Sequence, residues 1–239
     1  MRPLLVTILI TLSPCVVAGG AGTPDLCSSP KFQTAFLEGW LNAEDFPALS
    51  GNLLAYGDVA VPCLDEIARR GGEPLGFTQC KGRDESCRGW ALRALSEIQT
   101  PKAKQSLLRM LDLGWTGQPL YGLLGAITTI RPPESRPVLL KVLESADPHA
   151  RSWAMLAVGA LGNKDDFDAM VRCARRLPVA ELNRAARAFE FLADPRAVPV
   201  LRELAAPLPE RSRGEIDDAI QRLERGEPIR PDWGQRPKR

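Results

Sequence analysis

The chain contains a single histidine, His149, which narrows the chemistry it could perform. His149 follows Asp147-Pro148, a dipeptide typical of the start of a helix. A di-iron centre would require several His-Glu pairs, and a zinc site would require His149 and cysteines at a close spacing such as Cys-x-x-Cys. The sequence has neither pattern. A nucleophilic mechanism would require a serine or cysteine beside His149, which sequence alone does not show, so we interpret His149 as a solvated residue at a helix N-terminus.

Carboxylate pairs at Asp165-Asp166 and Asp217-Asp218 are the other candidates for acid–base chemistry. Both pairs fall in expected first turns of helices, where the helix dipole stabilises negative charge. The glycine motifs that bind phosphates and dinucleotides are missing from the sequence, and so is the His-Glu-x-x-His zinc motif. We therefore predict no catalytic residues, no metal site and no cofactor.

The elements that would position any such residue show a regular repeat. Runs with helical periodicity end at intervals of 32, 31, 31 and 31 residues. Each of the first four is followed by a turn and a second helical run, and each helix is too short to be stable alone in water. The sequence therefore predicts helix pairs that bury their apolar sides against neighbouring pairs. The first runs end at Ile98, Ile130, Leu161, Leu192 and Leu223.

The repeat register sets the domain organisation. A first unit spans 44–55 and 59–70, a capping helix at 30–41 precedes it, and a helix over 215–225 closes the stack with a charged face. The predicted segments are a signal peptide (1–21), an N-terminal segment with the capping helix (22–43), the repeats (44–228) with a loop inserted at about 71–89, and a basic flexible tail (229–239).

The N-terminus has the features of a signal peptide. Arg2 precedes an apolar run over residues 4–12, and small residues follow this run. We predict cleavage after Ala18 or Ala21 and export to a periplasmic or extracellular location. No later stretch is apolar enough to span a membrane.

Two alternatives remain open for this N-terminal segment. The apolar run could be a buried helix of the mature protein. The chain could instead be a lipoprotein acylated at Cys15, although Pro14 is a poor match to the small residue expected before a lipidated cysteine. We expect contact with a membrane only if Cys15 is lipidated.

The remaining cysteines are five in number, so at least one thiol stays unpaired in an oxidising compartment. We predict a disulfide between Cys80 and Cys87, which would pin the inserted loop. The alternative joins Cys27 or Cys63 to one of these two residues. Cys173 aligns with an inward-facing apolar position, so we expect a buried thiol there.

Two sequence segments carry a resemblance to a known family. Ala150–Asn163 and Asp194–Leu204 together resemble one short HEAT-like repeat of the phycobilisome-lyase type. The resemblance covers roughly Glu44 to Arg225. It implies an all-α fold, a right-handed α-solenoid of about five HEAT-like helix pairs with terminal capping helices. Such repeats serve many binding roles and a few enzymes, so the resemblance specifies a fold more than a function.

Two regions are candidates for binding. Arg109, Lys141 and Arg172 occupy the same position in successive second helices, with Glu66 and Glu203 at that position in the flanking repeats. The resemblance implies that second helices line the concave side, and we hypothesise that the three cations contact an anionic surface of a partner. The alternative is an ordinary solvated helix face. The inserted loop is the other candidate, because loops that interrupt a repeat often lie at a binding face; the alternative is a surface bulge without a function.

The composition bounds the function further. Thirty-one basic and 29 acidic residues give a formal charge of +2, which argues against nucleic acid as the partner. We predict a non-enzymatic scaffold that binds another protein in an extracytoplasmic compartment. The alternatives are a lyase or other enzyme built on the same repeats, or a nucleic-acid-binding HEAT-like protein.

Overall fold

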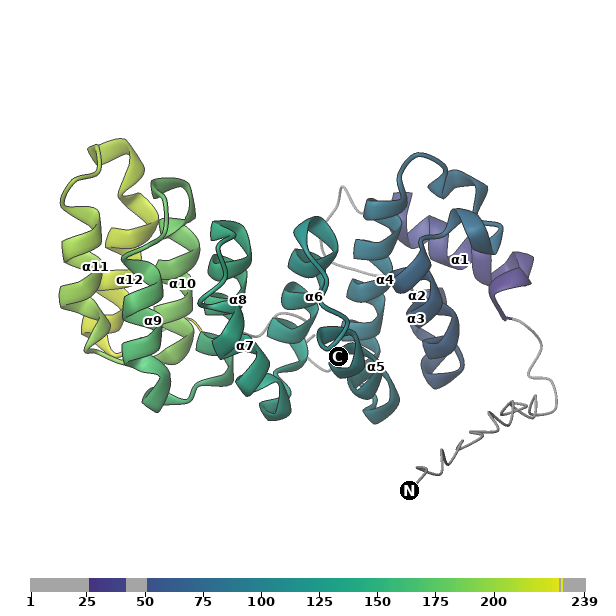
Figure 1. Ribbon diagram of the computed structural model, residues 1–239, viewed down its shortest axis with the longest axis horizontal. Helices are drawn as coiled ribbons and strands as arrows, with labels where there is room; N and C mark the ends of the chain where they lie inside the picture. The colour runs from purple at the N-terminus through teal and green to yellow at the C-terminus, as the bar shows by residue number, and fades with distance from the viewer. Residues whose placement is uncertain (1–25, 42–50, 228, 230–239) are drawn as a thin grey trace, which may run out of the picture.

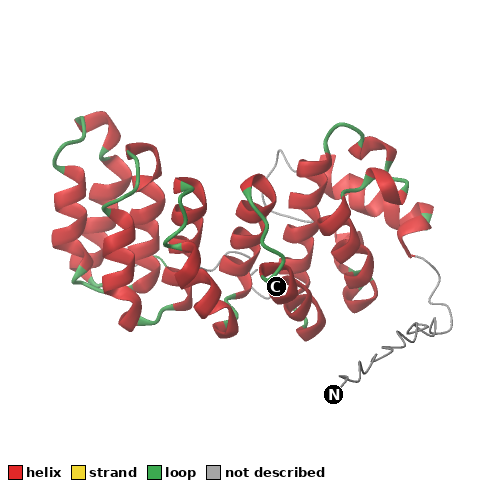
Figure 2. Ribbon diagram, in the orientation of Figure 1, coloured by secondary structure: helices red, strands yellow, loops and turns green. Residues whose placement is uncertain are grey.

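A computed structural model describes residues 26–41, 51–227 and 229 (Figure 1). The regular structure in these ranges is entirely helical, as the sequence predicts, and includes no strand (Figure 2). The predicted signal peptide with Cys15 lies outside the described residues, as does the predicted tail apart from Ile229. No helix in the described ranges combines the length and apolarity needed to cross a bilayer.

The N-terminal part begins with a 3-10 turn, η1 (Leu26–Ser28), followed by α1 (Pro30–Leu41). The bounds of α1 coincide with those of the predicted capping helix. The described part of the first unit comprises α2 (Gly51–Leu54), η2 (Gly57–Val59) and α3 (Val61–Arg70). The earlier part of the predicted helix over 44–55 lies outside the described residues.

The inserted segment is shorter than predicted. We expected a loop over about 71–89, but the next helix, α4, already begins at Asp84. Asp84 and Glu85 lie in its first turn, where their charges favour helix formation. Two 3-10 turns occupy part of the segment before α4 (Asp84–Ile98), namely η3 (Glu73–Leu75) and η4 (Thr78–Cys80).

The inserted segment packs onto the capping helix. Phe77 is fully buried, and its ring centroid lies 5.2 Å from that of Phe36 in α1. The Trp90 indole of α4 donates a hydrogen bond of 3.1 Å to the Phe36 carbonyl oxygen. The insertion and α1 therefore close the N-terminal end of the repeats together.

Helix pairs follow one another through the rest of the described chain. Their first helices end at Ile98, Ile130, Leu161 and Leu192, the positions that the periodicity predicts. The last helix ends at Arg225, two residues after Leu223. The elements are α4 and α5 (Pro101–Leu111), α6 (Gly117–Ile130) and α7 (Arg136–Val142), α8 (Pro148–Leu161) and α9 (Phe167–Ala174), α10 (Leu182–Leu192) and α11 (Ala197–Ala205), and α12 (Gly214–Arg225).

The first helices stack directly on one another, from α4 through α6, α8 and α10 to α12 (Figure 1). The second helices pack mainly against first helices of their own or the next pair. The most extensive helix–helix contact joins α8 to α10, where small residues let the backbones approach closely. A Cβ atom at Gly159 would overlap the carbonyl oxygen of Ala188, so only glycine fits at this crossing.

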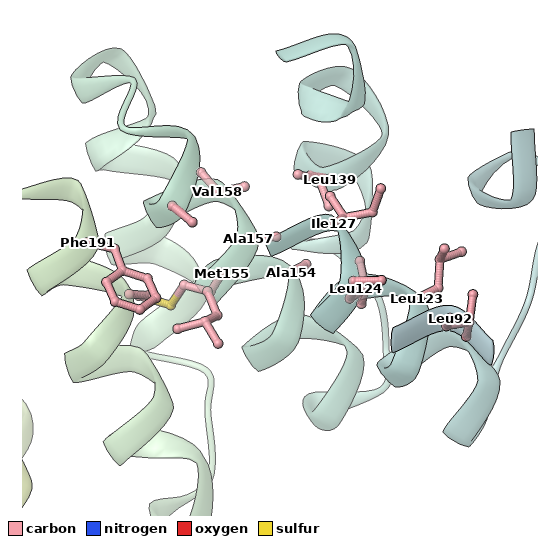
Figure 3. Packing of buried hydrophobic residues seen from close by; sticks show 14 of the residues in the cluster. Leu92, Leu123, Leu124, Ile127, Leu139, Ala154, Met155, Ala157, Val158 and Phe191 are labelled. Carbon is pink, nitrogen blue, oxygen red and sulfur yellow. The ribbon is translucent and has the colours of Figure 1, made fainter. Parts of the chain in front are cut away.

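One continuous apolar core runs through the stack. Buried residues from Cys27 to Leu223 form a single cluster, so no pair has a separate core of its own. Figure 3 shows part of it, with Leu124 and Ile127 of α6 near Leu139 of α7 and Ala154 of α8. Each pair is therefore stabilised by burial against its neighbours.

The turn after each first helix has the same backbone conformation. Gln99, Arg131, Gly162 and Ala193 each follow the end of a first helix with a positive φ, between 49° and 74°. A left-handed residue at this position ends an α-helix and redirects the chain. The turns are thus as periodic as the helices.

Candidate functional site

Arg109, Lys141 and Arg172 form the cation row, the candidate surface that the repeat register predicts. The structure places them in the last turns of α5, α7 and α9, which are second helices of successive pairs. All three are exposed, and the Arg109 side chain is 63% accessible. Positive charge in a last turn also complements the helix dipole, and this is the usual structural role of basic residues at the end of a helix.

The acidic residues at the flanking positions are already paired within the chain. Glu66 forms ion pairs with Arg69 at 2.5 Å and with Arg70 at 2.8 Å. Glu203 pairs with Arg175 at 2.8 Å, and this hydrogen bond lowers the pKa of the Glu203 carboxyl. The two acids are therefore largely neutralised by neighbours in the same chain.

The cations of the row are not neutralised in the same way. Within the described residues, Lys141 and Arg172 make no ion pair and no side-chain hydrogen bond. The Arg109 guanidinium reaches Asp65 only at 3.7 Å, and Arg69 binds the same carboxylate at 2.7 Å. Among the described residues, Lys141 and Arg172 therefore present positive charge that no acid neutralises, whereas Arg109 shares Asp65 with Arg69.

A second group of polar residues lies where successive first helices begin. The Nδ1 atom of His149, in the first turn of α8, lies 2.8 Å from Oε1 of Glu181. Glu181 precedes α10 and is only 3% exposed, whereas the His149 side chain is 57% exposed. The histidine cluster, as we name it, comprises Tyr121, Asp147, His149, Ser152, Glu181 and Arg184.

The buried carboxylate of Glu181 is fully engaged. Its Oε2 atom lies 2.5 Å from the Ser152 hydroxyl and forms an ion pair with Arg184. Arg184 also donates to the Ser152 oxygen at 2.7 Å, and its guanidinium lies 4.4 Å from the ring centre of Trp153. These contacts join α8 to the start of α10.

Tyr121 and Asp147 extend the cluster to α6. The Tyr121 hydroxyl donates a 2.6 Å hydrogen bond to Asp147, which raises the pKa of Tyr121 to about 12. Burial raises the pKa of the Asp147 carboxyl, but the hydrogen bonds from Tyr121 and from the His149 amide outweigh burial and lower that pKa overall. Asp147 also caps α8 through the His149 amide at 2.9 Å.

The histidine cluster has only part of the arrangement of a catalytic site. A buried carboxylate orients the His149 ring, as in acid–base dyads. However, Ser152 is fully buried and bonded to Glu181 and Arg184, so its hydroxyl is not presented to a substrate. Within the described ranges, no three or more His, Cys, Asp or Glu side chains are grouped so as to hold a metal ion.

Sequence reasoning placed His149 correctly at an exposed helix start but missed its pairing. His149 and Glu181 are 32 residues apart, about one repeat. In a stack of repeats, residues one period apart lie side by side, so the spacing of His149 and Glu181 could have indicated that they are neighbours. The repeat pattern did not identify Glu181 as a candidate, because this residue lies in the linker before α10, in the short turn η7 (Val179–Glu181).

The cysteines are joined in two pairs. Cys80 and Cys87 have their sulfur atoms 2.04 Å apart, which is the pairing expected for the insertion. Cys27 and Cys63 are joined at 1.98 Å, a pairing that the sequence reasoning did not consider. All four are buried, as is the free thiol of Cys173. The N-terminal end of the stack is thus covalently fastened at two points.

Comparison with known proteins supports the repeat assignment. Residues 121–188 match a family described as HEAT repeats. This stretch runs from α6 into α10 and includes Lys141, Arg172 and the whole histidine cluster. No curated protein matches the chain. Residues 121–188 are therefore similar to HEAT repeats, and the helix pairs of the structure continue on both sides of this stretch.

Proposed function

We propose that the protein is a non-enzymatic scaffold that binds another protein through the second-helix side of its repeats. The cation row carries this proposal, because Lys141 and Arg172 are exposed and unpaired within the described residues while the neighbouring acids are paired. The continuous core holds the second helices in fixed relative positions. A surface that is ordered before binding loses little entropy when a partner docks.

We further propose that binding takes place in an extracytoplasmic compartment. The two buried disulfides support this location, because disulfides persist in oxidising compartments and are rare in the cytosol. The signal-peptide pattern over residues 1–21 points the same way. Fractionation of cells, followed by N-terminal sequencing of the processed chain, tests this part of the proposal; recovery of the uncleaved chain in the cytosol would contradict it.

Photocrosslinking tests the binding surface. A photoreactive amino acid is placed at Lys141 or Arg172 and, as a control, at Asn183, an exposed residue of the first helix α10. We expect the same crosslinked protein from both row positions and none from Asn183. An identical pattern at all three positions, or no adduct at any, would remove the proposal.

The proposal assigns no catalytic residue. The histidine cluster instead fastens successive first helices, so replacing His149 by Gln should leave the crosslinked product unchanged. The alternative suggested by the lyase resemblance makes a different prediction, since a lyase for bilin pigments binds a coloured ligand. Visible absorbance that copurifies with the protein would favour that alternative.

A further inference from the structure

We propose that the Cys27–Cys63 disulfide is a redox-sensitive switch that holds the capping helix α1 on the stack. A dithiol reductant opens this bond before it opens Cys80–Cys87, and α1 then detaches from the repeats together with η1. The apolar surface beneath α1 becomes exposed, while the repeats from α6 onward stay folded. The switch acts at the N-terminal end of the stack and does not depend on the cation row.

The two disulfides join different parts of this end. Cys27 lies in η1 and Cys63 lies in α3, so their bond connects the cap to the first unit. Cys80 and Cys87 connect the inserted segment to the start of α4. Within the described residues, no other disulfide reaches η1 or α1. Reduction of Cys27–Cys63 therefore frees the cap, whereas reduction of Cys80–Cys87 leaves it joined to α3.

The turn η1 and the helix α1 form one unit. The side-chain amide of Gln33 in α1 donates a hydrogen bond of 2.8 Å to the Cys27 carbonyl oxygen. The backbone N–H of Gln33 donates another, of 3.0 Å, to the Ser29 carbonyl oxygen. The disulfide at Cys27 therefore restrains α1 as well as η1.

The helix α1 lies at one end of the stack and depends on the repeats for its stability (Figure 1). Its 12 residues are too few for a stable helix in water alone. Phe32 and Phe36 are fully buried, and their ring centroids each lie 5.2 Å from an aromatic ring outside α1, that of Tyr56 and that of Phe77 respectively. The entropy lost when the backbone is ordered opposes this gain from burial. The disulfide offsets part of that loss by keeping a detached cap close to its site, so opening the bond favours detachment.

The accessibility of the sulfur atoms sets the order in which the bonds open. A thiolate must reach one of the two sulfur atoms before it can break a disulfide. Cys27 and Cys63 are 6% and 4% exposed, whereas Cys80 and Cys87 are fully buried. Local opening of a terminal helix also requires less free energy than opening of a segment packed within the stack. Cys27–Cys63 is therefore the bond that a reductant reaches first.

The reaction is a thiol–disulfide exchange with a dithiol, which a thiol–disulfide oxidoreductase or dithiothreitol supplies. One reductant thiolate attacks the Cys27 sulfur, forms a mixed disulfide and expels the Cys63 thiolate, which takes up a proton. The second reductant thiolate attacks the reductant sulfur of the mixed disulfide and expels the Cys27 thiolate, which is protonated in turn. Two electrons pass to the protein, which gains two thiols, and the dithiol becomes a disulfide.

Stepwise reduction tests the order of opening. The purified protein with both disulfides closed is equilibrated with graded mixtures of reduced and oxidised dithiothreitol, quenched with acid, alkylated and mapped by mass spectrometry. We expect a species with Cys27–Cys63 open and Cys80–Cys87 closed to accumulate. In that species, hydrogen exchange in α1 should be about tenfold faster, with α8 and α10 unchanged. Opening of Cys80–Cys87 first, opening of both bonds together, or unchanged protection of α1 would overturn the proposal.

A variant of the cap tests whether α1 shields the bond. Phe32→Ala removes the contact with Tyr56 and leaves every cysteine in place. It should speed the reduction of Cys27–Cys63 about tenfold, because α1 opens more often, and leave the rate for Cys80–Cys87 unchanged. Lys31→Ala, at an exposed position of the same helix, is the matched control and should change neither rate. Equal rates for the two variants would overturn the shielding.

Removing the bond itself gives the last arm of the test. In C27S/C63S, hydrogen exchange in α1 should be fast without reductant and should not respond to dithiothreitol. Protection of α1 equal to that of the oxidised protein would show that packing alone holds the cap, and the switch would be wrong. Reduction of the folded natural chain gives the same readout, so the test does not require that this variant folds.

Discussion

Buried carboxylates paired with arginines join successive repeats at the level of single residues. Asp166, before α9, is 2% exposed and accepts three hydrogen bonds from Arg136 at the start of α7, one of them at 2.9 Å. Glu190 of α10, also 2% exposed, is bound by Arg222 of α12 at 2.5 Å. Burying an ion is costly unless it is paired, so each pair favours one relative position of two neighbouring repeats.

Removing one partner of such a pair should be costly. Arg136→Ala leaves the carboxylate of Asp166 buried without its partner, and we expect the free energy of unfolding to fall clearly. The exposed pair Lys104–Glu134 spans the same 30 residues and offers a matched control. Lys104→Ala should cost less than about 0.5 kcal/mol in urea unfolding. Equal losses in the free energy of unfolding for the two variants would show that the burial of Asp166 does not increase the contribution of its ion pair to stability.

The left-handed residues after the first helices give a second prediction. Ala193 has φ of 53°, a conformation that disfavours residues with a Cβ, whereas the equivalent Gly162 adopts it without that cost. Ala193→Gly should therefore stabilise the protein by about 0.5–1 kcal/mol, and Gly162→Ala should destabilise it by about 1 kcal/mol. Thermal unfolding measures both. A stabilising Gly162→Ala would contradict this reading of the turns.

Cys173 provides a prediction about pH and reactivity. Burial raises the pKa of its thiol to about 11. A raised pKa means that the folded chain favours the protonated thiol, so its contribution to stability is full below the ordinary thiol pKa and is lost as the pH rises through about 11. At pH 8 we expect the folded mature chain to resist an alkylating reagent. When the mature chain is unfolded without a reductant, so that both disulfides stay intact, we expect the reagent to modify one thiol, that of Cys173. Rapid labelling of the folded chain would contradict the burial of Cys173.

At the scale of elements, the insertion is stabilised by a covalent bond and by one aromatic anchor. The Cys80–Cys87 bond closes a short loop, because these residues are seven positions apart. Phe77 fixes the same segment on α1. Gly72 lets Cys80 approach, since a Cβ atom there would overlap the Cys80 sulfur. The segment is therefore an ordered part of the N-terminal end of the stack.

The two disulfides should differ in their effect on stability according to loop length. The loop-entropy relation gives about 2.5 kcal/mol for Cys80–Cys87 and about 4 kcal/mol for Cys27–Cys63, whose residues are 36 positions apart. We expect the double variant C27A/C63A to lose more stability than C80A/C87A in urea unfolding. The opposite order would show that packing at Phe77, rather than chain entropy, sets the contribution of the insertion.

The helices were predictable from sequence where periodicity and turn residues agreed. Ile130 and Leu161 end helices because an apolar period of 3.6 stops there and a turn follows. The start of α4 was missed because Gly82 and a run of charged residues in this region resemble a loop, although Asp84 is a favourable first-turn residue. Local sequence thus fixes the ends of helices better where a regular repeat supports the assignment.

The candidate surface was predictable only in part, for a physical reason. Register alone places Arg109, Lys141 and Arg172 on one exposed position, because every second helix presents the same side to solvent. The pairing of Glu66 with Arg70 is an i,i+4 contact within one helix and could also be inferred. Glu203 pairs with Arg175, 28 residues away, and that contact depends on how the linker between repeats is folded.

Across the whole molecule, stability depends on contacts between neighbouring pairs. The core cluster is continuous, and the first helices contact one another in sequence from α4 to α12. In such a linear stack, the free energy of folding is approximately a sum over units and the interfaces between them. The two disulfides of the described residues lie at the N-terminal end, so an interface in the middle can be weakened while this end stays covalently joined.

The α8–α10 interface allows a direct test of this coupling. Gly159→Ala places a methyl group against the Ala188 backbone, and we expect a loss of about 2–3 kcal/mol because the backbone cannot move aside cheaply. Gly89→Ala in α4 is the control, since a Cβ there meets nothing within 4 Å and alanine favours a helix. Hydrogen exchange of Gly159→Ala should show lost protection in α8, α10 and α12, with α4 and α6 still protected. Uniform loss of protection would mean that the chain unfolds as one unit and that the repeats are not coupled only through nearest neighbours.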